Sequence, residues 1–250
     1  MFVEVYDLTH VGQVRELNED SFKISGFENG SALGVCVLAD GMGGHNAGEI
    51  ASSTAAELVC DDLVENLGET DSKKISLNIA AAIDFANSEV YSMSLKNPGQ
   101  AGMGTTVVVA YVNENSVRIA NIGDSRLYII SDGTMTQLTR DHSWVQMWVD
   151  LGQMTPEEAA VSPSRNAILR AVGIDSKVES DLFTVDFTDS ENATILLCSD
   201  GLSDYLAQED IFSIINDSTL SLDDRTSALI EGANKGGGGD NITAVLFEIE

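Results

Sequence analysis

Four aspartates in this 250-residue chain follow or precede strand-like apolar segments, at positions where the backbone must turn. They are Asp40 in Leu-Ala-Asp-Gly-Met-Gly-Gly, Asp124 in Ile-Gly-Asp-Ser-Arg, Asp200 in Cys-Ser-Asp-Gly-Leu and Asp240 in Gly-Gly-Asp-Asn-Ile-Thr. A single Asp-Gly is an ordinary turn, but four acidic positions beside buried strands predict that the carboxylates converge at one rim. Because converging carboxylates repel one another, they are tolerated mainly where cations lie between them.

The ligand chemistry of these positions favours hard cations. Oxygen-only ligands are typical of Mg²⁺ or Mn²⁺, and no cysteine or histidine accompanies the aspartates at the spacing that zinc prefers. Two metal ions that share a carboxylate would lower the pKa of a trapped water and orient it for in-line attack on phosphorus. Gly41, Gly43 and Gly44 would let the backbone approach an ion, although they also suit a tight turn before the next helix.

A second acidic group, with one cation, occurs near the N-terminus as Arg15-Glu-Leu-Asn18-Glu19-Asp20. It could be a charge cluster at a helix end. If it folds against the metal rim, Arg15 could hold two phosphate oxygens in a fork, while Glu19 and Asp20 hold metal-bound waters.

The elements that must position these residues follow from hydrophobic periodicity. The pattern predicts strands over 3–9, 33–39, 105–112, 116–122, 126–130, 135–138, 182–187, 194–198 and 242–249, and helices over 46–67, 72–95, 203–215 and 222–234. The strand over 33–39 is expected to stop at Asp40-Gly41, and the segment 105–138 to form an antiparallel meander. Two short helices are expected within 141–173, the second capped by Thr155 with Pro156 at its first position. Two sheets faced by helices, an α+β fold, account for this order.

Composition narrows the function classes. With 40 acidic against 13 basic residues, the net charge of −27 disfavours nucleic acid and anionic membranes as partners. No apolar run is long enough to span a membrane, and the N-terminus does not resemble a secretion signal. The isolated cysteines Cys36, Cys60 and Cys198 read as buried thiols, so a reducing, cytoplasmic location is expected. A monomer is the default expectation.

Taken together, the Arg-x-x-Asn-Glu-Asp, Asp-Gly-Met-Gly-Gly, Gly-Asp-Ser-Arg, Ser-Asp-Gly-Leu and Gly-Asp-Asn-Ile-Thr segments resemble the metal-dependent protein phosphatases of type 2C, in their compact bacterial form. The resemblance spans essentially the whole chain. It implies one domain over 1–250, a four-layer αββα sandwich of two antiparallel sheets flanked by helix pairs, and a small flap at about 142–175. It also implies hydrolysis of phosphoserine and phosphothreonine on proteins at a binuclear Mn²⁺ or Mg²⁺ centre, with substrates phosphorylated by a serine/threonine kinase.

The same resemblance implies a role for each matched residue. Asp40 would bridge the two ions, Gly41 would offer its carbonyl to the second ion, and Asp200 and Asp240 would complete the first. Arg15 would bind the substrate phosphate. Glu19 would act on the second ion through water, and Asp20 would support the groups that bind the ions. Asp124, with Asp200 and Asp204, would form a third metal site.

This sequence departs from the family pattern at two positions. Met42 stands where many eukaryotic relatives have a histidine proposed as general acid, and Ser162 replaces a histidine common in bacterial relatives. His45 is a candidate proton donor, although a lone histidine at a helix start more often caps or lies at the surface. A metal-bound water is an equal candidate.

Two other functions share part of this pattern. A phosphoprotein-binding pseudophosphatase of the same fold is disfavoured because every matched metal ligand is present. An acidic calcium-binding module would need an Asp-x-Asp-x-Asp-Gly loop closed by glutamate, which the sequence lacks, and would leave Arg15 unexplained.

Overall fold

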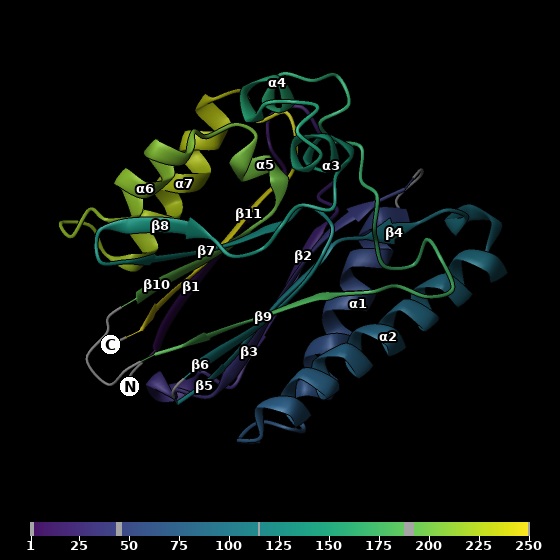
Figure 1. The fold of residues 1–250 in the computed structure, drawn as a ribbon, viewed down its shortest axis with the longest axis horizontal. Coiled ribbons are helices and arrows are strands. Elements are labelled where there is room, and N and C mark those ends of the chain that lie inside the picture. The colour runs from purple at the N-terminus through teal and green to yellow at the C-terminus, as the bar shows by residue number, and fades with distance from the viewer. Residues whose placement is uncertain (1–2, 44–46, 115, 188–192, 250) are drawn as a thin grey trace.

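A computed structural model of the chain describes residues 3–43, 47–114, 116–187 and 193–249. Two antiparallel sheets pack face to face, and helices cover both outer faces (Figure 1). The α+β sandwich predicted from the sequence is therefore confirmed.

The first sheet has five strands in the order β1-β11-β10-β7-β8. Their bounds are β1 (Val3–His10), β11 (Ile242–Ile249), β10 (Ala193–Cys198), β7 (Arg126–Ser131) and β8 (Thr134–Gln137). Helices α5 (Asp200–Ser203), α6 (Gln208–Ile215) and α7 (Leu222–Lys235) cover its outer face.

The second sheet has the order β2-β3-β5-β6-β9, with the short strand β4 paired to the end of β3. The bounds are β2 (Asp20–Ser25), β3 (Gly34–Met42), β4 (Gly104–Thr105), β5 (Val107–Asn113), β6 (Ser116–Ile122) and β9 (Asp181–Asp186). Two long helices, α1 (Ala47–Val64) and α2 (Ser72–Lys96), lie over its outer face, and short 3-10 turns occur at Glu28–Gly30 and Pro98–Gln100.

Strand β3 shows why the central segment reads as an unbroken apolar run. Val35 and Val37 point toward α1 and α2, whereas Cys36 and Leu38 point into the space between the sheets. All four side chains are fully buried, because both faces of this strand are covered. A third apolar cluster joins the first sheet to α5, α6 and α7, so each of the three interfaces of the sandwich has its own core.

The structure corrects three details of the sequence prediction. The segment 105–138 is not a meander, because the chain leaves the second sheet after β6 and enters the first at β7, through Gly123, Asp124 and Ser125. Strand β3 continues past Asp40 to Met42, because its end pairs with β4. The helix expected over 203–215 is two helices, α5 and α6, separated by a non-helical break after the first.

The segment between β8 and β9 contains the two expected short helices, α3 (Trp144–Asp150) and α4 (Pro156–Ala160). We call the part over 142–175 the flap. Thr155 caps α4 by accepting from the Glu158 backbone N–H, as the sequence predicted. The Glu158 side chain also accepts from the Thr155 backbone N–H, which completes a capping box. Within the described residues, no helix is both long and apolar enough to cross a membrane. All three cysteines are free and buried.

Candidate metal and phosphate site

The predicted acidic residues come from both sheets. Asp40 lies on β3 directly opposite Asp20 on β2. Asp124 occupies the crossing between the sheets, Asp200 is the first residue of α5, and Asp240 lies two residues before β11.

The carboxylates of this region oppose one another's ionisation. Burial, followed by repulsion from Asp20 and Asp200, raises the pKa of Asp40 well above its usual value. The charges of Asp124 and Asp240 raise it further. Burial, with repulsion from Asp124 first among the neighbours, likewise raises the pKa of Asp200 well above its usual value. The sequence thus brings these acids into one crowded negative region.

Among the acidic residues that the structure describes, Asp20 and Asp124 are the most enclosed, with 7% and 6% of their surface exposed. Burial raises the pKa of Asp124 to about 7, with the charge of Asp141 adding to it. Burial also raises the pKa of Asp20 to about 6, although hydrogen bonds from Thr243 and Ser199 oppose this rise. Negative charge at this depth needs a compensating cation or proton.

Two carboxylate oxygens in this region are suited to divalent cations. Among the described residues, Asp20 Oδ1 and Asp124 Oδ1 are buried without a hydrogen-bond donor, which leaves two oxygen atoms suited to a cation or to water that it holds. In the same part of the chain, no three acidic, histidine or cysteine side chains already surround one point closely enough to hold an ion. The donor set therefore fits Mg²⁺ or Mn²⁺ chemically, and ligation would require side-chain rotations at the rim.

Asp20 joins the two sheets at this rim. Its Oδ2 accepts hydrogen bonds from Ser199 Oγ at 2.7 Å and Thr243 Oγ1 at 2.6 Å, two hydroxyls of the other sheet's end. Thr243 Oγ1 also lies 2.7 Å from Thr9 Oγ1. These contacts fix one carboxylate oxygen and leave the other free. The free oxygen can then orient a metal ligand or a metal-bound water.

Arg15 lies beside Asp240. Its Nη2 donates to Asp240 Oδ2 at 2.8 Å, while 47% of the Arg15 side-chain surface remains exposed. The loop that carries it is tied down by Gln13, whose backbone N–H donates to Gly238 O at 2.7 Å. A Cβ at Gly12 would lie 2.1 Å from Asp240 O, so this close approach requires glycine. One face of the guanidinium is thus anchored, and the rest is accessible.

Asn241 fastens the same loop and was not identified as important from the sequence. Its Oδ1 accepts the Glu19 backbone N–H at 2.8 Å, and its Nδ2 donates to Val11 O and Leu17 O, both at 2.9 Å. Only 4% of its surface is exposed, and both amide hydrogens and the amide oxygen have partners within the protein. Its place directly after Asp240 was the one available signal, because a buried amide often orders a neighbouring loop.

The structure gives a different reason for glycine at position 41 from the one expected. A Cβ there would lie 2.2 Å from Gly48 O and 2.6 Å from Glu19 O, so glycine lets β3 pack against α1 and the Glu19 backbone. Access of an ion to the backbone is not needed to explain it. Gly43 has a φ of 151°, within the range that favours glycine. Gly44 and His45 lie outside the described residues.

Glu19 reaches the start of α1. A Cβ at Gly48 would meet Glu19 Oε1 at 2.4 Å, which shows how closely this carboxylate approaches the helix. Burial raises the pKa of Glu19, while the charge of Arg15 opposes the rise. Glu19 O also accepts the Gly41 backbone N–H at 3.1 Å, which ties this residue to the strand of Asp40.

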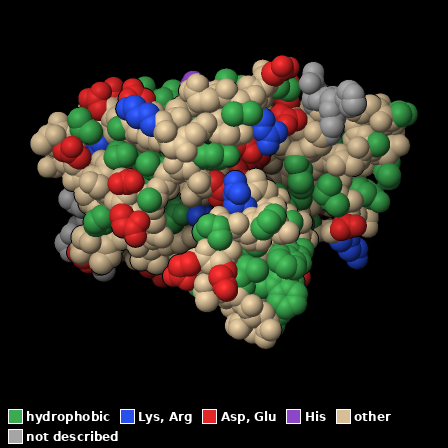
Figure 2. Space-filling model, turned by 90° about the horizontal axis from the view of Figure 1, so that it is seen from above, with side chains coloured by type: hydrophobic (Ala, Val, Ile, Leu, Met, Phe, Trp, Pro, Cys, Tyr) green, Lys and Arg blue, Asp and Glu red, His purple; other side chains and the backbone are tan. Residues whose placement is uncertain are grey.

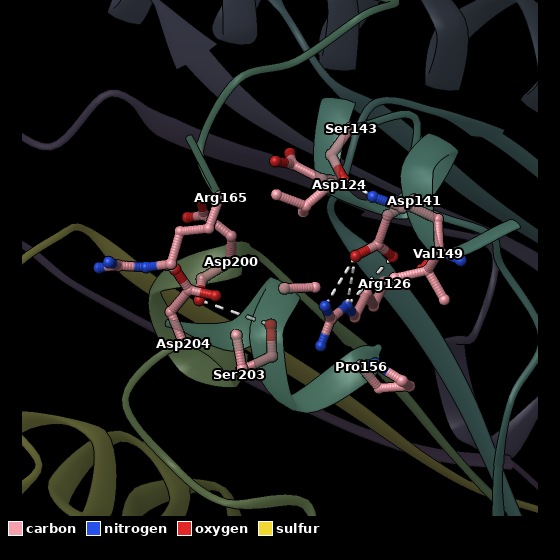
Figure 3. Close-up of a pocket in the computed structure, with 14 residues that line it drawn as sticks. Asp124, Arg126, Asp141, Ser143, Val149, Pro156, Arg165, Asp200, Ser203 and Asp204 are labelled. Carbon is pink, nitrogen blue, oxygen red and sulfur yellow. Dashed lines mark hydrogen bonds and ion pairs between the residues drawn. The ribbon is translucent and has the colours of Figure 1, made fainter. Parts of the chain in front are cut away.

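A cavity of about 370 Å³ lies between the flap and α5, and Asp124, Asp200 and Asp204 line it (Figure 3). Asp204 pairs with the flap residue Arg165 at 3.1 Å. In Figure 3 the paired Arg126 and Asp141 stand on the other side of the cavity, their side chains 2.7 Å apart. The residues expected at a third metal site therefore share one cavity, although Asp204 is already engaged by Arg165.

Figure 2 looks down on the end of the molecule where α3 and α4 lie. Acidic and basic side chains stand side by side near the middle of this face, and apolar side chains gather at its edge (Figure 2). This face is therefore not uniformly acidic, because basic and apolar side chains also lie on it.

Comparison with known proteins gives a consistent result. The sequence pattern of the family described as Protein phosphatase 2C matches residues 10–232. The serine/threonine phosphatase stp of Listeria innocua is 38% identical over 240 residues, which cover 96% of this chain and 93% of that protein. The crystal structure of the Mycobacterium tuberculosis serine/threonine phosphatase PstP/Ppp has a TM-score of 0.87 and 36% identity, with full coverage of both chains.

A further solved structure is the catalytic domain of the serine/threonine protein phosphatase PstP in complex with two manganese ions. It is 33% identical with a TM-score of 0.84, over 100% of this chain and 99% of that one. Since the family pattern and these relatives extend over nearly the whole sequence, the chain belongs to the protein phosphatase 2C family.

Proposed function

We propose that Asp40, Asp200 and Asp240 hold the divalent cations with which this chain, a metal-dependent serine/threonine protein phosphatase, hydrolyses phosphoproteins. The observation that carries the assignment is the placement of Asp40 opposite Asp20 on neighbouring strands, and of Asp124 and Asp200 on one cavity, so that their carboxylates repel one another. Without cations, such an arrangement would only destabilise the fold. Bound Mn²⁺ or Mg²⁺ would offset this charge and supply the Lewis acidity that activates water and polarises a phosphoryl oxygen.

The protein's own contribution begins with placement of the ligands. Asp40 would be shared between two ions, with Asp200 and Asp240 on the first and the Gly41 carbonyl on the second. Glu19 would act on the second ion through water, and Asp20 would orient the surrounding groups through its free Oδ1. Ser199 and Thr243 keep Asp20 in place, since both donate to its other oxygen.

Arg15 would bind the substrate phosphate. Its guanidinium is held at the rim by Asp240 and retains N–H groups that face solvent. Two of these can form parallel hydrogen bonds to phosphate oxygens, which orients the phosphorus for in-line attack. If Asp240 held an ion, its pair with Arg15 would open and the full donor set of Arg15 would be available to phosphate.

A third metal site at Asp124 and Asp200 is a further part of the proposal, supported by the shared cavity and the unpaired Asp124 Oδ1. Participation of Asp204 would require its bond to Arg165 to open. Met42 carries no proton to donate to the leaving group, so the candidate donors are a metal-bound water and His45, which lies outside the described residues.

Phosphorylated proteins are the substrates expected of a serine/threonine protein phosphatase. We propose that a serine/threonine kinase phosphorylates these substrates. We also propose that the chain acts in the cytoplasm as a monomer. Three buried free cysteines are compatible with a reducing compartment.

The test is release of inorganic phosphate from phosphoserine and phosphothreonine peptides by the purified chain, titrated with Mn²⁺. We expect turnover that rises with Mn²⁺ and stops when a chelator is added in excess. Tight peptide binding with no phosphate release at any Mn²⁺ concentration would instead support the pseudophosphatase.

A further inference from the structure

A second pocket, of about 280 Å³, opens beside Met42, the residue that follows the proposed metal ligand Gly41. Most of its wall comes from residues 168–179 at the end of the flap. Its apolar lining consists of Met42, Ile168, Leu169, Ala171, Ile174 and Val178. No role in the proposed chemistry uses this pocket.

The wall of the pocket is hydrogen-bonded to β4, the short strand that pairs with the end of β3. Val172 and Thr105 exchange backbone bonds of 3.0 and 2.9 Å, and Thr105 in turn pairs with Gly41 on β3. Met42 pairs with Gly104 on the same short strand. The pocket is therefore a lateral continuation of the strand end that holds Asp40 and Gly41.

Hydrogen bonds anchor the wall of the pocket at both ends. Buried Asn87 on α2 accepts the Gly173 N–H at 2.8 Å and donates to Asp175 O at 3.1 Å. Arg170 closes the loop from the other end, since its Nη1 donates to Glu179 O at 2.9 Å and to Asp181 Oδ1 at 2.8 Å. Few rotatable groups need to be ordered when such a pocket is filled.

Charge and exposure indicate what would fill it. Two cations, Arg170 and Lys177, and two acids, Asp175 and Glu179, line the pocket, so it is neutral in a chain whose net charge is −27. Leu169 and Ile174 expose 54% and 42% of their surface there. Large apolar side chains left open around a neutral hollow favour an uncharged apolar occupant.

We propose that this pocket receives an aliphatic or aromatic side chain of the phosphoprotein substrate, a few residues from the phosphorylated serine or threonine. The inference rests on the proposed phosphatase activity. Continuity of the wall with β3 makes the substrate the fitting occupant, because a polypeptide whose phosphate lies at the metal centre can extend along the paired end of β3 and β4 toward this pocket. The pocket would thus select substrates by sequence, while Arg15 and the ions recognise only phosphate.

The experiment compares phosphothreonine peptides that are identical except for leucine or serine, placed in turn at each of the four positions on either side of the phosphothreonine. For the wild-type chain we expect one position at which leucine raises kcat/KM about ten-fold over serine, as partial burial of one apolar side chain predicts. Leu169→Ser should reduce this preference to about two-fold or less, and Ile174→Ala should reduce it in the same direction. Manganese-dependent hydrolysis of a small aryl phosphate reports separately on the metal centre of each variant.

Val161→Ser is the matched control, since Val161 lies on the flap with 81% exposure and does not line the pocket. It should keep the wild-type preference for leucine. Equal rates for leucine and serine at all eight positions, or an unchanged preference in both pocket variants, would overturn the pocket assignment and leave the phosphatase intact. Failure of the wild-type chain to hydrolyse any peptide or the aryl phosphate would refute the proposed function itself.

Discussion

Asp40→Asn is expected to lower kcat/KM for manganese-dependent phosphopeptide hydrolysis by about 10³-fold, the largest effect of any single change in this chain. Asparagine keeps the size of the side chain but removes the charge that would be shared between two ions. Loss of a bridging carboxylate would weaken the binding of both ions, whereas loss of Asp200 or Asp240 would remove a ligand from only one ion. The loss should appear in kcat at saturating peptide, measured by phosphate release over a range of Mn²⁺ concentrations.

The same substitution should stabilise the fold when a chelator is present. The Asp40 carboxylate is desolvated and repelled by its acidic neighbours, so its neutral replacement should raise the free energy of unfolding by about 1–2 kcal/mol at neutral pH. Added Mn²⁺ should raise the melting temperature of the wild-type chain, by mass action, more than that of the variant. Asp84→Asn makes the same chemical change on the exposed face of α2 and should alter neither activity nor stability appreciably. An Asp40→Asn enzyme with near wild-type turnover would contradict the bridging role.

Arg15→Ala is expected to raise KM for phosphopeptides about 10- to 100-fold, with a much smaller change in kcat. The reason is the loss of two charge-assisted hydrogen bonds to phosphate, each worth about 1.5–3 kcal/mol before solvent exposure reduces it. Arg15→Lys should recover part of the affinity, since lysine restores the charge but not the planar fork. Steady-state kinetics at saturating Mn²⁺ measure both parameters.

Metal binding distinguishes this role of Arg15 from damage to the metal centre. Arg15 pairs with Asp240, so its removal frees a proposed ligand, and the affinity for Mn²⁺ should stay the same or increase. Calorimetric titration of Mn²⁺ into wild type and variant would show this. Weaker Mn²⁺ binding by Arg15→Ala, together with an unchanged KM at saturating metal, would argue against phosphate recognition.

Local patterns in the sequence predicted much of the fold. Strands β6 and β11 begin and end at the predicted residues, because strand periodicity and flanking turn residues agree there. The crossing at Gly123 was missed, since a short polar turn between two strands suits a hairpin as well as a change of sheet. Only contacts distant in sequence, such as the pairing of β7 with β10, decide between them.

In the candidate site too, local sequence patterns predicted some features and contacts distant in sequence determined the others. Aspartates beside strand ends could be recognised because their spacing resembles a family and their chemistry suits cations. The role of Asn241 could not be predicted, because its partners Val11, Leu17 and Glu19 lie more than 200 residues away in sequence. The reason for Gly41 was also hidden, since the backbone of α1 that it contacts is placed by tertiary packing alone.

Anomalous X-ray diffraction at the manganese edge, from crystals grown with Mn²⁺, tests the central claim most directly. Two strong peaks should appear on either side of the Asp40 carboxylate, one of them also within bonding distance of Asp200 and Asp240. Peaks confined to other acidic surfaces, with these three carboxylates bound to no metal, would contradict the assignment of the catalytic centre.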